Sequence, residues 1–185
     1  DIDISRKVGN RRETVRAMER GEHDLTIMGR PPRKALGRAI SLGPHPHGIV
    51  LPPDHPLTHV DTYEPARLME ETFQCREPGS GTRLLMERYL DRLAEGAPPA
   101  MVTMPSNETI KQAVIAGLGI GFLSLHTVED ELKSGRLALL RGNDLPVMRY
   151  WYLIVSDEEE ATEAAKRVAV EIEALSGRYL PEVTG

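Results

Sequence analysis

A glycine-rich segment, Glu77-Pro78-Gly79-Ser80-Gly81-Thr82-Arg83, contains the residues in this sequence best suited to binding an anion. It joins a predicted strand to a predicted helix, where backbone N–H groups can face a ligand and the helix dipole favours negative charge. Arg83 can add two parallel hydrogen bonds to a carboxylate or a phosphate. The Lys of a Walker loop is absent. A helix cap and tight turn, with Arg83 as a surface or interlobe charge, explains the same residues equally well.

A second junction of this kind is Met104-Pro105-Ser106-Asn107-Glu108. Its Ser and Asn can hold a ligand or cap the following helix, and capping is the more usual role of Ser there. In α/β folds, ligands bind beyond the carboxyl ends of strands, next to helix N-termini. The three junctions that fit this description are Met28–Pro31, Arg76–Arg83 and Thr103–Glu108.

Several other groups of residues suggest chemistry less strongly. Gly117-Leu118-Gly119-Ile120-Gly121 ends a helix and begins a strand, the reverse of a dinucleotide fingerprint, so we interpret it as a C-cap and close packing. Cys75 lies in an apolar strand, which predicts a buried structural thiol, and a single cysteine excludes an intramolecular disulfide. The sequence contains neither a Gly-x-Ser-x-Gly nucleophile elbow nor paired carboxylates in a clear acid/base arrangement, so no motif indicates an enzyme. The acidic run at 157–160 is interpreted as a solvated helix start.

Histidines raise the possibility of a metal site, but their setting does not favour one. The pairs His45/His47 and His55/His59 lie in proline-broken segments, and we expect them in turns or exposed to solvent. His126 follows an apolar strand, at an end where it can line a ligand cleft. No metal and no cofactor are predicted.

Hydrophobic periodicity supplies the elements that must position these residues, and their alternation predicts an α/β fold with mostly parallel sheets. Asn10 and Glu13 have capping-box spacing. The proline-rich segment 52–57 is interpreted as a crossover between two lobes, residues 1–52 with 157–180 and residues 53–156. Strands are predicted at 2–8, 24–29, 37–42, 47–51, 71–77, 99–104, 119–125, 137–140 and 148–155, and helices at 10–21, 64–70, 80–94, 106–117, 127–135 and from 156 or 157 onward.

Composition excludes some functions. The 185 residues carry a formal net charge of −5 and only 4% aromatic residues. An acidic chain with few aromatics is a poor nucleic-acid binder by itself, so any DNA role requires another part of a longer protein. No apolar run approaches the roughly 18 residues of a membrane helix, and no secretory signal is visible at the start.

The chain resembles the effector-binding domain of LysR-type transcriptional regulators over nearly its whole length. The combination of 28–32, 76–83 and 106–111 is most similar to the activators of Rubisco and Calvin-cycle operons. The segments that carry the family resemblance are Gly9–Thr14 and Asp24–Pro32 in the first lobe, Asp54–Leu57 at the crossover, and Asn107–Leu123 in the second lobe.

This resemblance implies a two-lobed, type 2 periplasmic-binding-protein-like fold in which each lobe is a mostly parallel sheet flanked by helices. It implies a cytoplasmic regulator with an N-terminal helix-turn-helix and a linker helix that lie outside this chain, assembled as a dimer or tetramer. The family's first strand-helix unit, which precedes residues 2–8, is also expected to be missing here.

The resemblance further implies that the domain senses a small anionic metabolite between its lobes and controls the DNA-bound oligomer. Phosphorylated effectors such as sugar bisphosphates, phosphoenolpyruvate and nicotinamide or adenine nucleotides are implied for the carbon-fixation subgroup. The implied contacts are Gly29, Arg30, Thr103, Met104, Pro105, Ser106 and Asn107, with Ser80 and Arg83 ranked below them and His126 added from its place after an apolar strand.

Three other functions fit the same predicted fold. A solute-binding protein of a transporter shares the architecture, and so do lyases of the prephenate-dehydratase type and some deaminases. A domain that serves only in oligomerisation, with a closed apolar cleft, is the third. An export signal favours the first, turnover of a ligand the second, and an empty cleft the third.

Overall fold

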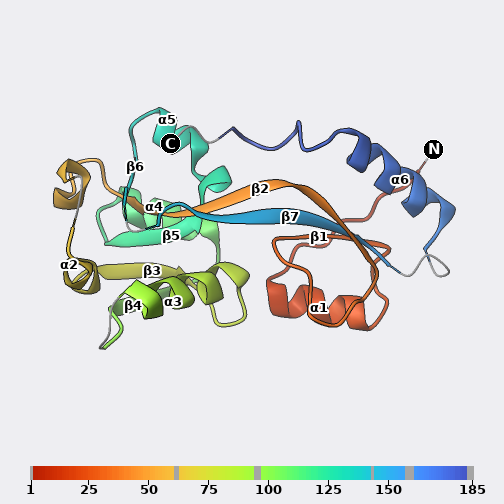
Figure 1. The fold of residues 1–185 in the computed structure, drawn as a ribbon, viewed down its shortest axis with the longest axis horizontal. Coiled ribbons are helices and arrows are strands. Elements are labelled where there is room, and N and C mark those ends of the chain that lie inside the picture. The colour runs from red at the N-terminus through yellow and green to blue at the C-terminus, as the bar shows by residue number, and fades with distance from the viewer. Residues whose placement is uncertain (1, 61–62, 94–96, 143, 157–160, 183–185) are drawn as a thin grey trace. The chain divides into compact units, whose positions relative to one another are not determined.

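In the computed structural model, helices and strands alternate along the described residues, which are 2–60, 63–93, 97–142, 144–156 and 161–182 (Figure 1). The chain divides into two units, Asp1–His45 with Arg149–Leu180 and Pro46–Met148 with Pro181–Gly185, called unit 1 and unit 2. Two long strands, β2 (Arg38–Leu51) and β7 (Val147–Val155), each belong in part to both units. The lobe boundaries expected at 52–53 and 156–157 stay a prediction.

Unit 1 is built from α1 (Arg11–Glu19), β1 (Leu25–Met28), parts of β2 and β7, and α6 (Glu163–Ala174). The predicted capping box begins α1: Asn10 Oδ1 accepts from the Glu13 amide at 3.1 Å, and Glu13 Oε2 accepts from the Asn10 amide at 2.9 Å. Strand β1 pairs antiparallel with β7, from Leu25 opposite Val155 to Met28 opposite Tyr152. A small core of Leu42, Leu153, Val155, Ala161 and Ala169 holds the unit together.

Unit 2 is arranged around three parallel strands: β3 (Thr72–Arg76) pairs with β4 (Ala100–Met104) and with β5 (Ile120–Ser124). On the other side of β5 the pairing is antiparallel, with β2, which also pairs with the short β6. The strand order is β1-β7-β2-β5-β3-β4. The remaining elements are η1 (Pro56–His59), α2 (Pro65–Met69), α3 (Gly81–Leu93), α4 (Asn107–Ile115), η2 (Leu125–Thr127), α5 (Glu129–Lys133) and β6 (Ala138–Leu139).

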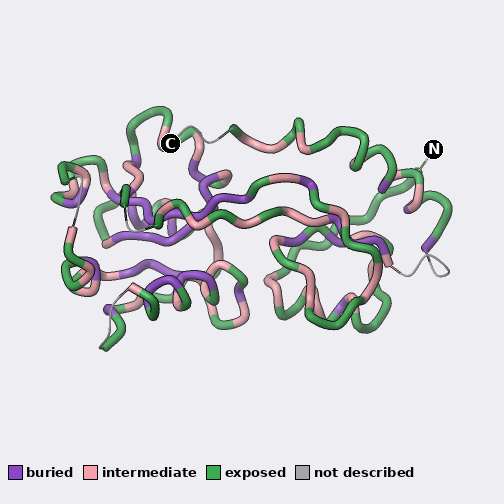
Figure 2. The backbone as a smooth tube through the Cα atoms, in the orientation of Figure 1, coloured by how far each residue is buried: buried purple, intermediate pink, exposed green. Residues whose placement is uncertain are grey.

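The two long helices of unit 2 pack on opposite faces of its strands. Side chains alternate between faces along a strand. Phe73 and Phe122 pack with the apolar side of α3, whereas Leu123 packs with Ile110 of α4. With both faces covered, every residue of β5 is buried, the polar Ser124 included (Figure 2).

The predicted helices and strands of unit 2 form, whereas only some of those predicted for unit 1 do. Most elements form within one or two residues of their predicted positions. Parallel pairing, however, is confined to β3, β4 and β5 among the described pairs, so the sheet is mixed.

The predicted strand at 2–8 does not form: Ile2, Ile4 and Val8 are exposed and in no described ladder, and alternation makes a strand only where a neighbouring strand and a core are present. The acidic run at 157–160 lies outside the described residues. The last helix begins later than predicted, at Glu163 with Thr162 as its N-cap.

Strand β2 joins two predicted strands, and this corrects the expectation for two histidines. Proline's φ suits extended backbone, so Pro44 and Pro46 do not end the strand. His45 and His47 are therefore buried in β2 rather than lying exposed in a turn. His45 stacks on Trp151, with ring centroids 3.8 Å apart.

The glycine cluster at the end of α4 is confirmed as a C-cap and close-packing site, and it gives a stability test. A Cβ on Gly119, where φ is +135°, would lie 2.2 Å from the Thr72 carbonyl oxygen, whereas Gly117, at φ +76°, faces open space. We expect Gly117→Ala to lower the free energy of unfolding by about 1 kcal/mol through left-handed strain. Gly119→Ala should cost at least about 2 kcal/mol more, because backbone must move. Urea denaturation measures both, and equal losses would contradict the described packing.

Candidate anion site at the ends of β3 and β4

The register of β3 and β4 brings two of the three predicted junctions together. Arg76, the last residue of β3, is opposite Met104, the last residue of β4. Both strands end at the same edge, and α3 and α4 begin shortly after them. The turn at 77–80 and the cap at 105–107 are therefore neighbours, as the rule for ligand sites in α/β folds predicts.

The Arg76 side chain makes hydrogen bonds both to α4 and to the turn that follows β3. Its Nη1 donates to Asn107 Oδ1 at 2.9 Å, which ties the end of β3 to the first turn of α4. Its Nε and Nη2 donate to the two carboxylate oxygens of Glu77 at 2.8 and 3.1 Å. The Arg76 side chain is 17% exposed, and its guanidinium donates to acceptors on two sides. Such a forked group is suited to a carboxylate or a phosphate.

Arg76 and Glu77 lie in a predicted junction, but neither is among the predicted contact residues. The sequence signal for a contact role is the position of Arg76, because this residue ends a strand whose carboxyl end faces a helix N-terminus. Its bond to Asn107 joins residues 31 apart in sequence, and no local pattern predicts that contact.

Ser80 and Arg83 lie on the α3 side of the same edge. Ser80 is buried, and its carbonyl accepts from the Leu84 amide at 3.2 Å. Arg83 Nε donates to Glu87 Oε1 at 2.6 Å, while its Nη1 donates to Cys75 Sγ and to the Arg76 carbonyl. Arg83, a residue of α3, thus stabilises the end of β3 through its bonds to Cys75 and Arg76. A direct ligand contact by Ser80 or Arg83 stays a prediction.

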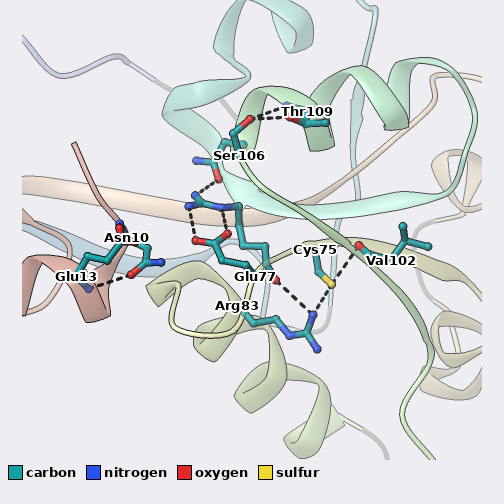
Figure 3. Close-up of polar contacts among 10 residues, drawn as sticks. Asn10, Glu13, Cys75, Glu77, Arg83, Val102, Ser106 and Thr109 are labelled. Atoms are coloured by element: carbon teal, nitrogen blue, oxygen red, sulfur yellow. Dashed lines mark hydrogen bonds and ion pairs between the residues drawn. The ribbon is translucent and has the colours of Figure 1, made fainter. Parts of the chain in front are cut away.

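The α4 side contains five of the predicted contact residues. Ser106 is the helix cap: its Oγ accepts from the Thr109 amide at 3.1 Å and lies 2.8 Å from Thr109 Oγ1 (Figure 3). Asn107 is engaged with Arg76. Thr103 and Pro105 are exposed, and Met104 packs partly against the core beneath α4. A ligand role for these residues also stays a prediction.

The remaining predicted residues lie elsewhere in the chain. Gly29 and Arg30 follow β1 in unit 1, where Arg30 is exposed and its carbonyl accepts from Arg11 Nη1. His126 is in η2, just after β5. Because β5 runs parallel to β3, the carboxyl end of β5 lies at the same edge of the sheet as Arg76. Burial lowers the pKa of His126, and the Glu129 carboxylate offsets part of this effect.

An ionic cluster around the buried Glu131 anchors α4 on α5, and no local sequence pattern predicts it. The carboxylate of Glu131, 7% exposed, is 3.1 Å from Lys111 Nζ and 2.8 Å from Arg136 Nη2. Lys111 also reaches Glu108 at 2.8 Å. Burial alone would lower the pKa of Lys111, but its bonds to Glu108 and Glu131 outweigh burial and raise it. The cluster fixes the helix whose first turn carries Asn107.

Cys75 is buried in β3, which confirms the predicted structural thiol. Its Sγ is 3.4 Å from the Val102 carbonyl oxygen. Burial raises the pKa of the thiol, and the Arg83 charge offsets part of that rise. Within the part of the chain that the structure describes, no group of three or more His, Cys, Asp or Glu side chains is placed to hold a metal ion. No described helix has the length and apolar character needed to span a membrane.

Comparison with known proteins identifies the class of protein that this fold and edge define. Residues 1–175 match the LysR substrate binding domain family, and the chain belongs to that family. The fold is the type 2 periplasmic-binding-like fold of LysR regulatory domains.

Named relatives make the comparison more specific. The chain is 50% identical over 181 residues to the HTH-type transcriptional regulator CbbR of Cereibacter sphaeroides, covering 98% of this chain and 58% of the relative. It is 39% identical over 165 residues to the HTH-type transcriptional regulator CfxR of Cupriavidus necator, covering 89% of this chain and 52% of that relative. The chain thus spans little more than half the length of these curated relatives.

Among solved structures, the regulatory domain of CcmR from Synechocystis PCC6803, in complex with 2-PG, superposes with a TM-score of 0.85 and 28% identity, over 94% of this chain and 83% of that one. The regulatory domain of MetR from N. meningitidis superposes at 0.71 with 18% identity, over 95% of this chain and 81% of that one, and supports the fold alone.

The buried carboxylate of Glu131 gives a prediction for stability. Glu131→Gln removes one of the two carboxylates that bind the partly buried Lys111, and we expect a loss of about 2 kcal/mol in the free energy of unfolding. Glu163→Gln is the matched control, because Glu163 is also in the first turn of a helix but its pair with Lys166 is exposed. That control should cost less than about 1 kcal/mol. Equal losses in urea denaturation would rule out an anchoring role for the cluster.

The buried thiol gives a second prediction, for reactivity. At pH 8 the native Cys75 should react with a disulfide reagent such as DTNB at least about 100-fold more slowly than in 8 M urea, because it is buried and its pKa is raised. The reaction rate should rise in parallel with the unfolding transition followed by circular dichroism. Complete reaction of the native protein within seconds would show that β3 is not covered as described.

Proposed function

We propose that this domain senses a small phosphorylated or otherwise anionic metabolite, and that unit 2 binds the anion at Arg76. The observation that carries this proposal is the Arg76 guanidinium, fixed by Asn107 at an edge where two helices begin. A helix N-terminus and a fixed fork of N–H donors are complementary to phosphate oxygens.

The names of the relatives, and the ligand named for one solved structure, also support this proposal. The CcmR regulatory domain, 28% identical to this chain, forms a complex with 2-PG. The CbbR and CfxR proteins are named as HTH-type transcriptional regulators, and others among the relatives are named as RuBisCO operon transcriptional regulators. These names favour a regulator over a transport protein or an enzyme, the alternatives that the fold alone leaves open.

In the full-length protein we propose that effector binding shifts an equilibrium between conformations of the domain, and that a cytoplasmic, DNA-bound oligomer responds. The net charge of −5 does not suit this chain for DNA contact, so a separate part of the protein would bind DNA. Carbon-fixation genes are the proposed target, because several relatives are named for the Rubisco operon.

We propose Ser106, Asn107, Gly29 and Arg30 as further ligand contacts. Ser106 offers a hydroxyl at the start of α4 and Arg30 an exposed guanidinium after β1. Thr103, Met104 and Pro105 are also proposed as contacts, and Ser80, Arg83 and His126 as weaker candidates.

The proposal predicts that effector binding depends on Arg76. We expect isothermal titration calorimetry on the full-length protein to detect binding of 2-PG or another phosphorylated metabolite, tested together with sugar bisphosphates, phosphoenolpyruvate and nicotinamide or adenine nucleotides. Arg76→Gln should weaken that binding by about 10- to 150-fold, the equivalent of a lost charge-assisted bond of about 1.5–3 kcal/mol. Arg30→Gln should also weaken it if Arg30 is a contact as proposed.

Arg88→Gln is the matched control, because Arg88 is an exposed arginine on α3 whose loss changes the net charge equally. This variant should bind as the unaltered protein does. The proposed function fails if no metabolite of this set binds, and the site assignment fails if Arg76→Gln and Arg88→Gln have the same effect.

A further inference from the structure

The carboxylate of Glu77 already occupies the face of Arg76 that an anionic ligand would use. Arg76 Nε and Nη2 donate to the two oxygens of Glu77 at 2.8 and 3.1 Å, the bidentate geometry that a guanidinium also offers to a ligand carboxylate or phosphate. Asn107 takes Nη1 at 2.9 Å. An anion that binds Arg76 in the same forked manner must therefore replace Glu77.

The backbone explains why consecutive side chains can pair here. Neighbours in a strand point to opposite faces, but β3 ends at Arg76 and the chain turns at Glu77. The Ser80 amide donates to the Glu77 carbonyl at 3.1 Å across Pro78 and Gly79, and Gly79 has φ +105°, in the manner of a type II turn. Proline at 78 also restricts Glu77 to extended backbone. The turn thus holds the Glu77 carboxylate against Arg76.

We propose that Glu77 is an affinity-determining residue, an internal carboxylate that competes with every anion for Arg76, so that only an anion that binds more strongly than a carboxylate, such as a phosphate, displaces it to a useful extent. The proposal rests on the proposed function of the same edge. A ligand carboxylate has the same charge and the same two oxygens as Glu77, so the exchange gains nothing to offset the tethering of Glu77 beside Arg76. A phosphate group carries a charge of about −1.5 to −2 and three acceptor oxygens, and it gains from the helix N-terminus as well.

A different role for Glu77 makes the opposite prediction. If Glu77 only orients Arg76 for the ligand, its removal leaves the guanidinium less fixed, and anions bind more weakly or equally well. If Glu77 competes, its neutralisation frees the guanidinium, and anions bind more tightly. The sign of the change in affinity therefore separates competition from orientation.

The test uses calorimetric titration of the full-length protein with inorganic phosphate, acetate and 2-PG. Glu77→Gln keeps the length of the side chain but removes its charge, so we expect affinity for phosphate to rise about tenfold. Affinity for acetate should rise by about the same factor, because both anions displace the same carboxylate, and the preference for phosphate over acetate should therefore be unchanged. Glu70→Gln, an exposed glutamate of unit 2, is the control for net charge and should change each affinity less than about twofold.

A second variant, expected to weaken phosphate binding rather than strengthen it, keeps the proposal testable if Glu77→Gln lowers the free energy of unfolding. Asn107→Asp places a second carboxylate within reach of Arg76 Nη1 and should weaken phosphate binding about tenfold. Unchanged or weaker phosphate binding by a folded Glu77→Gln protein would overturn the role of Glu77. If binding still depends on Arg76 in that experiment, the proposed function stands. If neither the unaltered protein nor Glu77→Gln binds any of the three anions or the metabolite set, both proposals fail.

Discussion

The register between β3 and β4 is the constraint on which the candidate site depends. Parallel pairing places Arg76 opposite Met104, so both strands end at the same level and both following helices begin at one edge. A shift of one residue would turn the Arg76 side chain to the other face of the strand. The bond from Arg76 to Asn107, which connects the ends of these two strands, would then be impossible.

Packing on both faces of unit 2 keeps this register in place. Phe73 and Phe122 are fixed against α3 on one face, and Leu123 against Ile110 of α4 on the other. Because each face has its own apolar partners, a slipped strand would lose contacts on both sides. The ion pair between the buried Glu131 and Lys111 also fixes the position of α4, because a buried carboxylate that loses its partner is strongly destabilising.

What the sequence predicts correctly here is mostly local. The capping box at Asn10, the Ser106 cap and the strand at 119–125 follow from spacing within a few residues, and each forms. The failures involve partners that are distant in sequence. Residues 2–8 alternate like a strand but have no described pairing partner, and two predicted strands join as β2.

The candidate site shows the same division between local and distant information. Its place at two strand-to-helix junctions is predictable from the pattern of elements, whereas the central role of Arg76 is not. Arg83, which sequence spacing made the more prominent arginine, is turned toward Glu87 and Cys75. Arg76 is at the end of β3, and Arg83 is on a face of α3 that packs toward Cys75. Which arginine reaches the edge is therefore decided by strand register and helix packing, which join residues that are distant in sequence.

Electrostatics give this edge a character that the sequence motif alone does not suggest. A glycine-rich turn with an arginine indicates an open, positively charged cradle, yet Arg76 and Glu77 together are neutral. The chain as a whole is acidic, so long-range attraction would add little to the capture of an anion. Binding at such an edge would depend on exchange at short range, where the charge and the number of oxygens on the incoming group decide whether it replaces a tethered carboxylate.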